Sequence, residues 1–322
     1  LPDQVFSFLE GKVRNSRSPD LFLGALRTVA ASRPPYRLKA LQQLLEFTKD
    51  ENDLLQAKLV GHLKELMSHE TLAELIIEFA RAQLASLLED PDVVKREEEL
   101  KMTAEAQQEP QALNSSGARA QPVDQPLPPL QVNSLVKRYL NLYLGLYTER
   151  PELLLGAVEV YSRLKSEELR AGISRSVIFR VKTVGVDQPV VLQLVVNHPD
   201  NTDKLALDLC DANGPTPAMA RAVMDGFLAN KVDSRFVASV FPGLSRDEAL
   251  ASLPRLLSLP QTTQRRIVTM TLSRISGFPV SPEELLIHLH LTRGPNNVDM
   301  IKECAQWIGM MFDDPSKGLL KT

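Results

Sequence analysis

Residues 233–259 read DSRFVASVFPGLSRDEALASLPRLLSL, a pattern that predicts two short helices joined by a turn. Asp233 is a suitable N-cap for the first helix, and Pro242-Gly243 end it. Ser245 and Glu248 have the spacing of a capping box at the start of the second helix. Each helix has an apolar face that it cannot cover alone. The stretch therefore predicts a helical hairpin that needs neighbouring helices.

Pro254 falls inside the second predicted helix. Proline has no backbone N–H, so the carbonyl of Leu250 would lose its usual partner. We therefore expect a kink or a new helix start at Pro254.

The same helical spacing of apolar residues continues through most of the chain. Helix starts recur about every 15–18 residues, which fits stacked helix pairs of the HEAT or armadillo kind. The sequence thus predicts an all-α fold, a HEAT/armadillo-like α-solenoid of helical hairpins interrupted by a Pro-rich linker. Outside residues 233–259, the predicted helices cover residues 3–13, 19–33, 36–47, 52–67, 70–88, 133–149, 151–164, 167–181, 203–209, 217–228, 262–275, 282–291 and 298–311.

Changes in composition predict three parts. Residues 1–91 form a first helical repeat block, and residues 132–322 form a C-terminal helical repeat block. Between them, residues 92–131 are first charged and then Pro-rich, with five prolines between residues 110 and 131. We expect this linker to be disordered because it has too little apolar surface to offset its ordering entropy. For its charged part, residues 92–109, an exposed helical extension is the alternative.

Residues 177–196, VIFRVKTVGVDQPVVLQLVV, leave the secondary structure open. Their many β-branched residues favour two strands joined near Gly185. Two strands alone in a helical chain would have no sheet to join, which favours helices.

The overall composition argues against several classes of protein. The net charge of −3 and the pI near 6.0 give no electrostatic signature of nucleic-acid or membrane binding. The only two cysteines, Cys210 and Cys304, lie far apart, which favours a reducing compartment. The chain begins at Leu1, as a fragment of a longer protein would.

The sequence contains no arrangement that predicts catalysis. It has no phosphate-binding glycine loop, and nothing assembles a nucleophile, a base and an orienting group. His288 and His290 are two residues apart, so on a helix they point in different directions and make a poor metal pair. We therefore expect neither an enzyme nor a cofactor or metal site.

Arg265 and Arg266, with Lys302 nearby in sequence, are candidates for a basic patch that binds RNA or an acidic partner. The ordinary alternative is a solvated helix face. The predicted partner-binding residues are Arg235, Arg255, Arg265, Arg266 and Lys302.

Several motifs, taken in order, resemble the symplekin family. They are Arg235-Phe236, Gly243-Leu244 and Leu253-Pro254-Arg255-Leu256 in the hairpin, PEELLIHLH at residues 282–290, and VKRYLNLYL at residues 136–144. No single motif is diagnostic, but their order on both sides of the linker is that of the family. The chain departs from the family at Phe241-Pro242, where Leu-Asn is usual.

This resemblance implies a nuclear scaffold of pre-mRNA 3′-end processing. The implied partners are two subunits of the cleavage and polyadenylation specificity factor, the metallo-β-lactamase-type nuclease and its inactive sister, and, less directly, cleavage stimulation factor. Contact with RNA would be indirect or weak, and no membrane contact is implied. The resemblance also implies that residues 177–196 are helical and that the family's N-terminal HEAT domain, which holds the polymerase II tail phosphatase, lies outside this chain. The alternative function is a helical-repeat RNA-binding protein.

Overall fold

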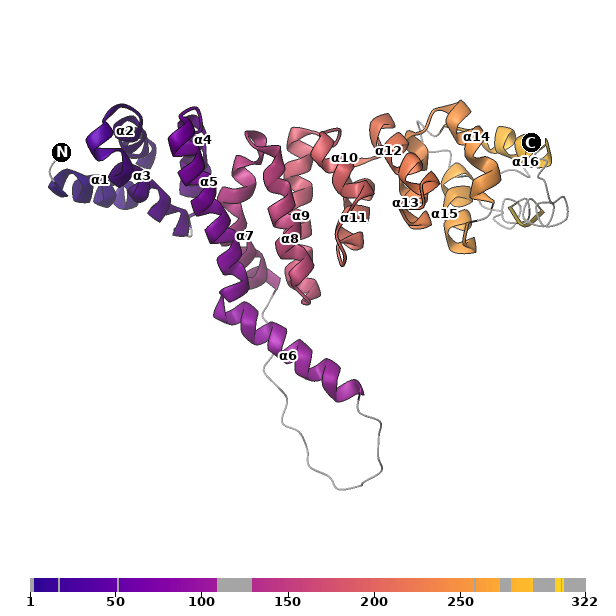
Figure 1. Cartoon of the computed structure of the whole chain (residues 1–322), viewed down its shortest axis with the longest axis horizontal. Coiled ribbons are helices and arrows are strands. Elements are labelled where there is room, and N and C mark those ends of the chain that lie inside the picture. Colours follow the sequence, from indigo (N-terminus) through magenta and orange to yellow (C-terminus); the bar gives the residue numbers. More distant parts are fainter. Residues whose placement is uncertain are drawn as a thin grey trace, which may run out of the picture. The chain divides into compact units, whose positions relative to one another are not determined.

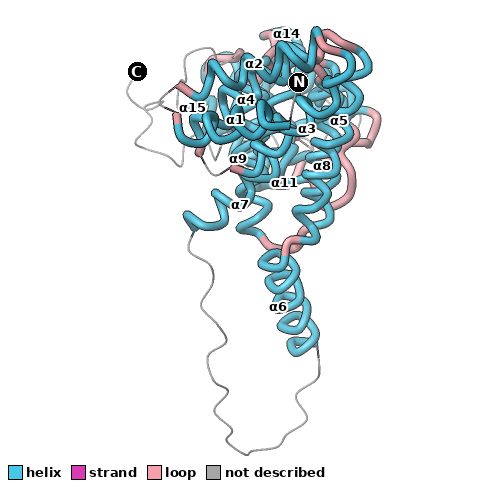
Figure 2. Tube along the Cα trace, turned by 90° about the vertical axis from the view of Figure 1, so that its left-hand side faces the viewer, coloured by secondary structure: helices cyan, strands magenta, loops and turns pink. Residues whose placement is uncertain are grey.

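The structure is a computed structural model that describes residues 3–16, 18–50, 52–108, 129–257, 259–272, 279–291, 305–307 and 309. Within these ranges all regular elements are helices, and none is a strand (Figure 2). The all-α prediction is thus confirmed. Contacts divide the chain into two compact units, Leu1–Thr183 and Val184–Thr322.

The first unit is a succession of helices, each packed against its neighbours in sequence. Helix α2 contacts α1, α3 and α4, and helix α5 contacts α3, α4, α7 and α8. The α-helices (Figure 1) are α1 Asp3–Asn15, α2 Pro19–Ser32, α3 Arg37–Glu46, α4 Asp53–Leu66, α5 Glu70–Ala85, α6 Pro91–Gln108, α7 Pro129–Gly145, α8 Leu154–Arg163 and α9 Glu167–Val184. The short 3₁₀-helices are η1 Pro34–Tyr36, η2 Phe47–Lys49, η3 Ser86–Glu89, η4 Leu146–Thr148 and η5 Pro151–Leu153.

Helices on the two sides of the Pro-rich segment pack together. Helix α7, which follows this segment, contacts α4 and α5, which precede it. The contacts thus place the break between compact units at residues 183 and 184 rather than at residues 92–131. The division into two repeat blocks stays a prediction. Residues 92–108 of the predicted linker are helical, as part of α6, and residues 109–128 lie outside the described residues.

Helix α6 begins in the body of the first unit and extends away from it in both views (Figures 1 and 2). Val93 is buried near its start. One turn further on, the Glu97 carboxylate accepts the backbone N–H of Lys165 at 2.8 Å and that of Ser166 at 2.8 Å. These N–H groups precede α9, so a side chain from a distant helix caps its N-terminus.

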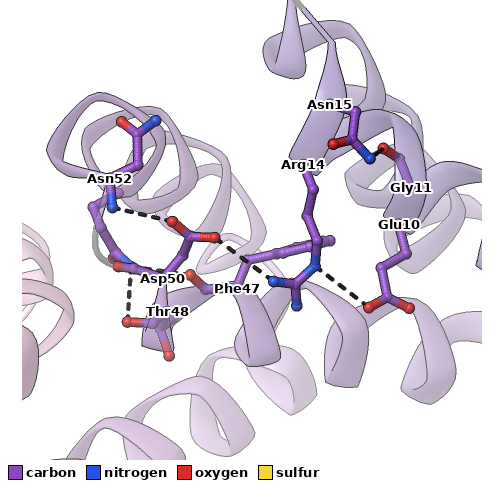
Figure 3. Close-up of polar contacts among 9 residues, drawn as sticks. Glu10, Gly11, Arg14, Asn15, Phe47, Thr48, Asp50 and Asn52 are labelled. Atoms are coloured by element: carbon purple, nitrogen blue, oxygen red, sulfur yellow. Dashed lines mark hydrogen bonds and ion pairs between the residues drawn. The ribbon is translucent and has the colours of Figure 1, made fainter.

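Polar contacts tie helix α1 to the turn between α3 and α4 (Figure 3). The Arg14 guanidinium lies 3.6 Å from the Glu10 carboxylate and 3.8 Å from that of Asp50. It also lies over the Phe47 ring, 5.6 Å from the centroid. Asp50 in turn accepts the N–H of Asn52 at 3.0 Å, and the Asn52 side chain caps α4. These exposed pairs orient α1 more than they stabilise it.

Gln56 is the buried polar residue that closes the same turn. Its side-chain amide donates to the carbonyls of Phe47, Thr48 and Asp50 at 2.9, 2.8 and 2.7 Å. Only 5% of Gln56 is exposed. Carbonyls at the end of a helix lack intrahelical donors. The side-chain amide of Gln56, on α4, therefore supplies hydrogen-bond donors to the carbonyls at the end of η2.

The second unit is built in the same way. Helix α13 contacts α11, α12 and α15, and α14 contacts α16. The helices are α10 Pro189–Val196, α11 Asp203–Asn213, α12 Pro217–Leu228, α13 Ser234–Val240, η6 Phe241–Gly243, α14 Arg246–Leu256, α15 Gln261–Leu272 and α16 Pro282–Leu291. Contacts between each helix and the next, or next but one, are consistent with a helical-repeat fold. Stacking into a HEAT-like solenoid stays a prediction.

Residues 177–196 are helical, as the resemblance implied. Helix α9 continues to Val184, the chain turns at Gly185 with φ of 114°, and α10 begins at Pro189. Buried Val191, Leu194 and Val195 follow helical spacing. Tertiary burial therefore overrides the local β propensity.

Candidate partner-binding surface

The hairpin at residues 233–259 begins with the predicted cap. The Asp233 carboxylate accepts the backbone N–H of Arg235 at 2.8 Å at the start of α13. This backbone hydrogen bond is the main reason why the pKa of Asp233 is lowered. Asp233 thus helps to fix where α13 starts.

The predicted capping box starts α14. The Ser245 hydroxyl accepts the N–H of Glu248 at 3.3 Å, and the Glu248 carboxylate accepts the N–H of Ser245 at 2.8 Å. Arg221 on α12 donates to the same carboxylate at 2.7 Å. The Ser245 backbone and hydroxyl, followed by Arg221, lower the pKa of Glu248 to about 2. A local cap therefore also connects α14 to α12.

The turn between α13 and α14 needs glycine because a Cβ has no room there. A Cβ at Gly243 would lie 2.8 Å from the carbonyl oxygen of Pro215. Real Cβ atoms essentially never approach another atom so closely. The Gly243-Leu244 motif thus lets two backbone segments touch.

Gln264 on α15 has the same role as Gln56 on α4. Its side-chain amide donates to the carbonyl of Leu257 at 2.6 Å, just after α14 ends. Both glutamines are the fourth residue of their helix. In both units, a buried glutamine thus donates hydrogen bonds to backbone carbonyls at the end of the preceding helix.

The two helices of the hairpin pack more against other helices than against each other. Helix α13 lies on α11, α12 and α15, whereas α14 contacts α16. Arg246 at the start of α14 donates to Glu284 of α16 at 2.8 Å, and Glu284 also forms a capping box with Ser281 at the start of α16. Helix α14 runs through Pro254 to Leu256, so no new helix starts there. A kink at Pro254 stays a prediction.

The predicted partner-binding arginines differ in how much of their charge is already paired. Arg235 lies 3.1 Å from Asp233 and 3.7 Å from Asp203. Arg266 lies 2.8 Å from Asp211. Neighbouring carboxylates therefore balance both cations.

Arg255 on α14 and Arg265 on α15 are exposed. Lys302 lies outside the described residues. Arg235 and Arg266 are exposed as well, so all four predicted residues that the structure describes stay candidates for contact with a partner.

Two exposed apolar residues on α16 were missed from the sequence. Ile287 is 56% exposed and Leu291 is 67% exposed. They are four residues apart, so they lie on one helical face. The leucines and the isoleucine of PEELLIHLHL fall on several sides of the helix, so the sequence pattern does not separate a buried face from an exposed one.

Metal-binding and nucleophilic groups were sought among the described residues. They contain no group of three or more His, Cys, Asp or Glu side chains placed to hold a metal ion. Cys210 is buried, and burial, with Asp211 nearby, raises the pKa of its thiol to about 12, which is unfavourable for a nucleophile. Trp307 is fully buried, in agreement with a packing role. Within the described part of the chain, no helix is both long and apolar enough to span a bilayer.

These features define an all-α protein of packed helices whose turns are capped by side chains. Residues 233–318 match the family model described as "Symplekin tight junction protein C terminal". The chain is thus consistent with a symplekin-family protein. The match confirms the resemblance of the motifs at residues 235–256 and 282–290, whereas the resemblance at residues 136–144 stays a prediction. No solved structure matches the chain.

Proposed function

We propose that this chain is a scaffold subunit of the pre-mRNA cleavage and polyadenylation machinery. In this role it holds the metallo-β-lactamase-type nuclease subunit and its inactive sister. The observation that carries the proposal is the symplekin match over residues 233–318, a region that contains the capped helices α13 to α16. Helical repeats offer extended surfaces for such docking, and a stable contact needs on the order of 1,000 Å² or more. Cleavage stimulation factor is a further proposed partner.

The second candidate, a helical-repeat RNA-binding protein, rests on the arginines of α15. The ion pair between Arg266 and Asp211 and the two carboxylates beside Arg235 weaken it. Net charge of −3 also disfavours strong binding to a polyanion. Binding to single-stranded RNA with a steep salt dependence would instead favour this candidate.

Assembly with the two partners tests the scaffold proposal. The chain is co-expressed with the C-terminal domains of the nuclease and of its sister, and the mixture is separated on a sizing column. We expect one complex that contains all three chains. Joint replacement of Arg255 and Arg265 by glutamate is expected to weaken it. Arg163→Glu, an exposed change on α8, is the control for added negative charge.

Location in the cell is a separate test, because the description of the matched family names tight junctions. We propose that the protein acts in the nucleus. Imaging of the tagged full-length protein is expected to show nuclear accumulation. Accumulation at cell junctions alone would count against a role in mRNA processing.

A further inference from the structure

The first unit contains a groove between helices α4, α7 and α9. Its volume is about 1080 Å³. Leu140 and Leu144 of α7 are among the residues that line it, although both are buried. A groove of this size, with an apolar part and polar walls, is suited to a short peptide segment rather than to a small ion.

One face of α9 forms a wall of this groove. It presents Arg175, Phe179 and Arg180, together with Gly172 and Ser176. These positions follow the spacing of a single helical face. Gly172 is buried within this wall, but the buried core residues Ile173, Val177 and Val181 lie on another side of α9, so most of the groove side is left for another contact.

Phe179 is 64% exposed although it is a large apolar residue. The Arg180 guanidinium lies 5.8 Å from the centroid of its ring. An exposed aromatic ring beside a cation is a common feature of peptide-binding surfaces.

The two arginines of α9 have no carboxylate partner among the described residues. Arg175 donates to the neutral side-chain oxygen of Asn133. Arg180 is half-buried, and burial alone lowers the pKa of its guanidinium. Such a cation gains from an anionic partner because burial has removed part of its hydration.

The opposite side of the groove is different. Lys137 of α7 lies 3.5 Å from Asp53, and Arg138 lies 3.6 Å from Asp90. These basic residues are already paired. Asp50 and Asp92 also line the groove. The free positive charge is therefore on α9, whereas carboxylates lie along the side of α4 and α6.

We propose that this groove binds a short acidic peptide segment of a partner protein. Acidic side chains of the peptide pair with Arg175 and Arg180, and an apolar side chain packs on Phe179. Arginine clusters commonly recognise acidic motifs in this way. A nucleic acid fits less well, because its uniform negative charge would also meet the carboxylates on the other side.

Peptide binding to the whole chain tests the proposal. The probe is a fluorescein-labelled peptide of about ten residues, roughly 15 Å as a helix, with its glutamates on one side and one phenylalanine. Fluorescence anisotropy compares it with the same peptide in which lysine replaces glutamate. We expect only the acidic peptide to bind, and binding to weaken as salt is added.

Matched variants assign the site. The double change Arg175→Glu and Arg180→Glu is expected to weaken binding about tenfold or more. Phe179→Ala, at a largely exposed position, is expected to weaken it severalfold. Arg163→Glu adds the same kind of charge outside the groove and is expected to change nothing. Circular dichroism checks that each variant keeps its helix content.

Four results would overturn the proposal. They are no binding of the acidic peptide, equal binding of the lysine peptide, an equal loss with Arg163→Glu, and tighter binding of oligouridylate through the same arginines. The last would assign the groove to nucleic acid. None of these measurements uses the nuclease or its sister, so failure here leaves the scaffold proposal untouched.

Discussion

Gly243 lies where the turn between α13 and α14 meets the segment before α12, and its replacement by alanine tests why this turn needs glycine. The added Cβ would lie 2.8 Å from the Pro215 oxygen and 3.0 Å from the Pro215 carbonyl carbon. Ordinary contact begins at 3.4 Å, so the two backbones must separate by at least 0.6 Å at this point. The obstacle is backbone, which cannot rotate away as a side chain can.

The expected cost follows from this overlap. Overpacking of this kind destabilises a protein by about 1–3 kcal/mol. Alanine recovers up to about 1 kcal/mol by restricting the unfolded chain. We therefore expect Gly243→Ala to lower the free energy of unfolding of the second unit by about 1–2 kcal/mol. For a unit of this size the melting temperature would fall by about 3–7 °C.

Trp307 makes the measurement specific to the second unit. It is the only tryptophan, and it is fully buried within Val184–Thr322. Its fluorescence during thermal or urea unfolding therefore reports this unit. The matched control is Gly309→Ala, because a Cβ at Gly309 would meet none of the described residues within 4 Å.

We expect the control to leave the transition unchanged or to raise it slightly. If Gly243→Ala melts at the same temperature as Gly309→Ala, the close backbone approach does not explain the glycine.

Three further changes test other contacts. Gln56→Leu leaves three carbonyls without their side-chain donor, so it should lower the free energy of unfolding by about 2–3 kcal/mol. Urea titrations followed by circular dichroism measure this loss, and an unchanged midpoint would show that water replaces the amide. Glu97→Ala removes the cap of α9, so we expect the free energy of unfolding to fall by about 1 kcal/mol. Hydrogen exchange at the amides of Lys165 and Ser166 should become faster, and unchanged exchange there would contradict the cap. The pKa of Glu248 is lowered from 4.5 to about 2, so its contribution is present above pH 4.5 and is lost as the pH falls towards 2. The difference in unfolding free energy between the native protein and Glu248→Gln should therefore shrink over that range, and a constant difference would argue against the capping box.

Local features of the fold could be predicted because they depend on neighbouring residues. The cap at Asp233 and the box of Ser245 and Glu248 join residues two or three positions apart, so their spacing is visible in the sequence. The Gly243 contact could not be predicted in this way, because Pro215 is far away in sequence. The same holds for Gln264, since glutamine on a helix is usually a surface residue.

The candidate binding surfaces were harder to predict. The pairing of Arg266 with Asp211 joins positions 55 residues apart, and no local pattern reveals it. Arg175 and Arg180 were not singled out, although Phe179 on the charged side of a predicted helix was an available signal. Charge alone identified basic residues, whereas the tertiary contacts decide which of them already have partners.

Co-assembly with the nuclease and its inactive sister tests the central claim most directly. The chain is mixed at micromolar concentration with the C-terminal domains of both proteins, and the mass of each eluted species is measured by light scattering after a sizing column. The scaffold proposal predicts one species whose mass is that of this 35.8 kDa chain plus both partners. Elution of all three proteins as separate species would contradict it.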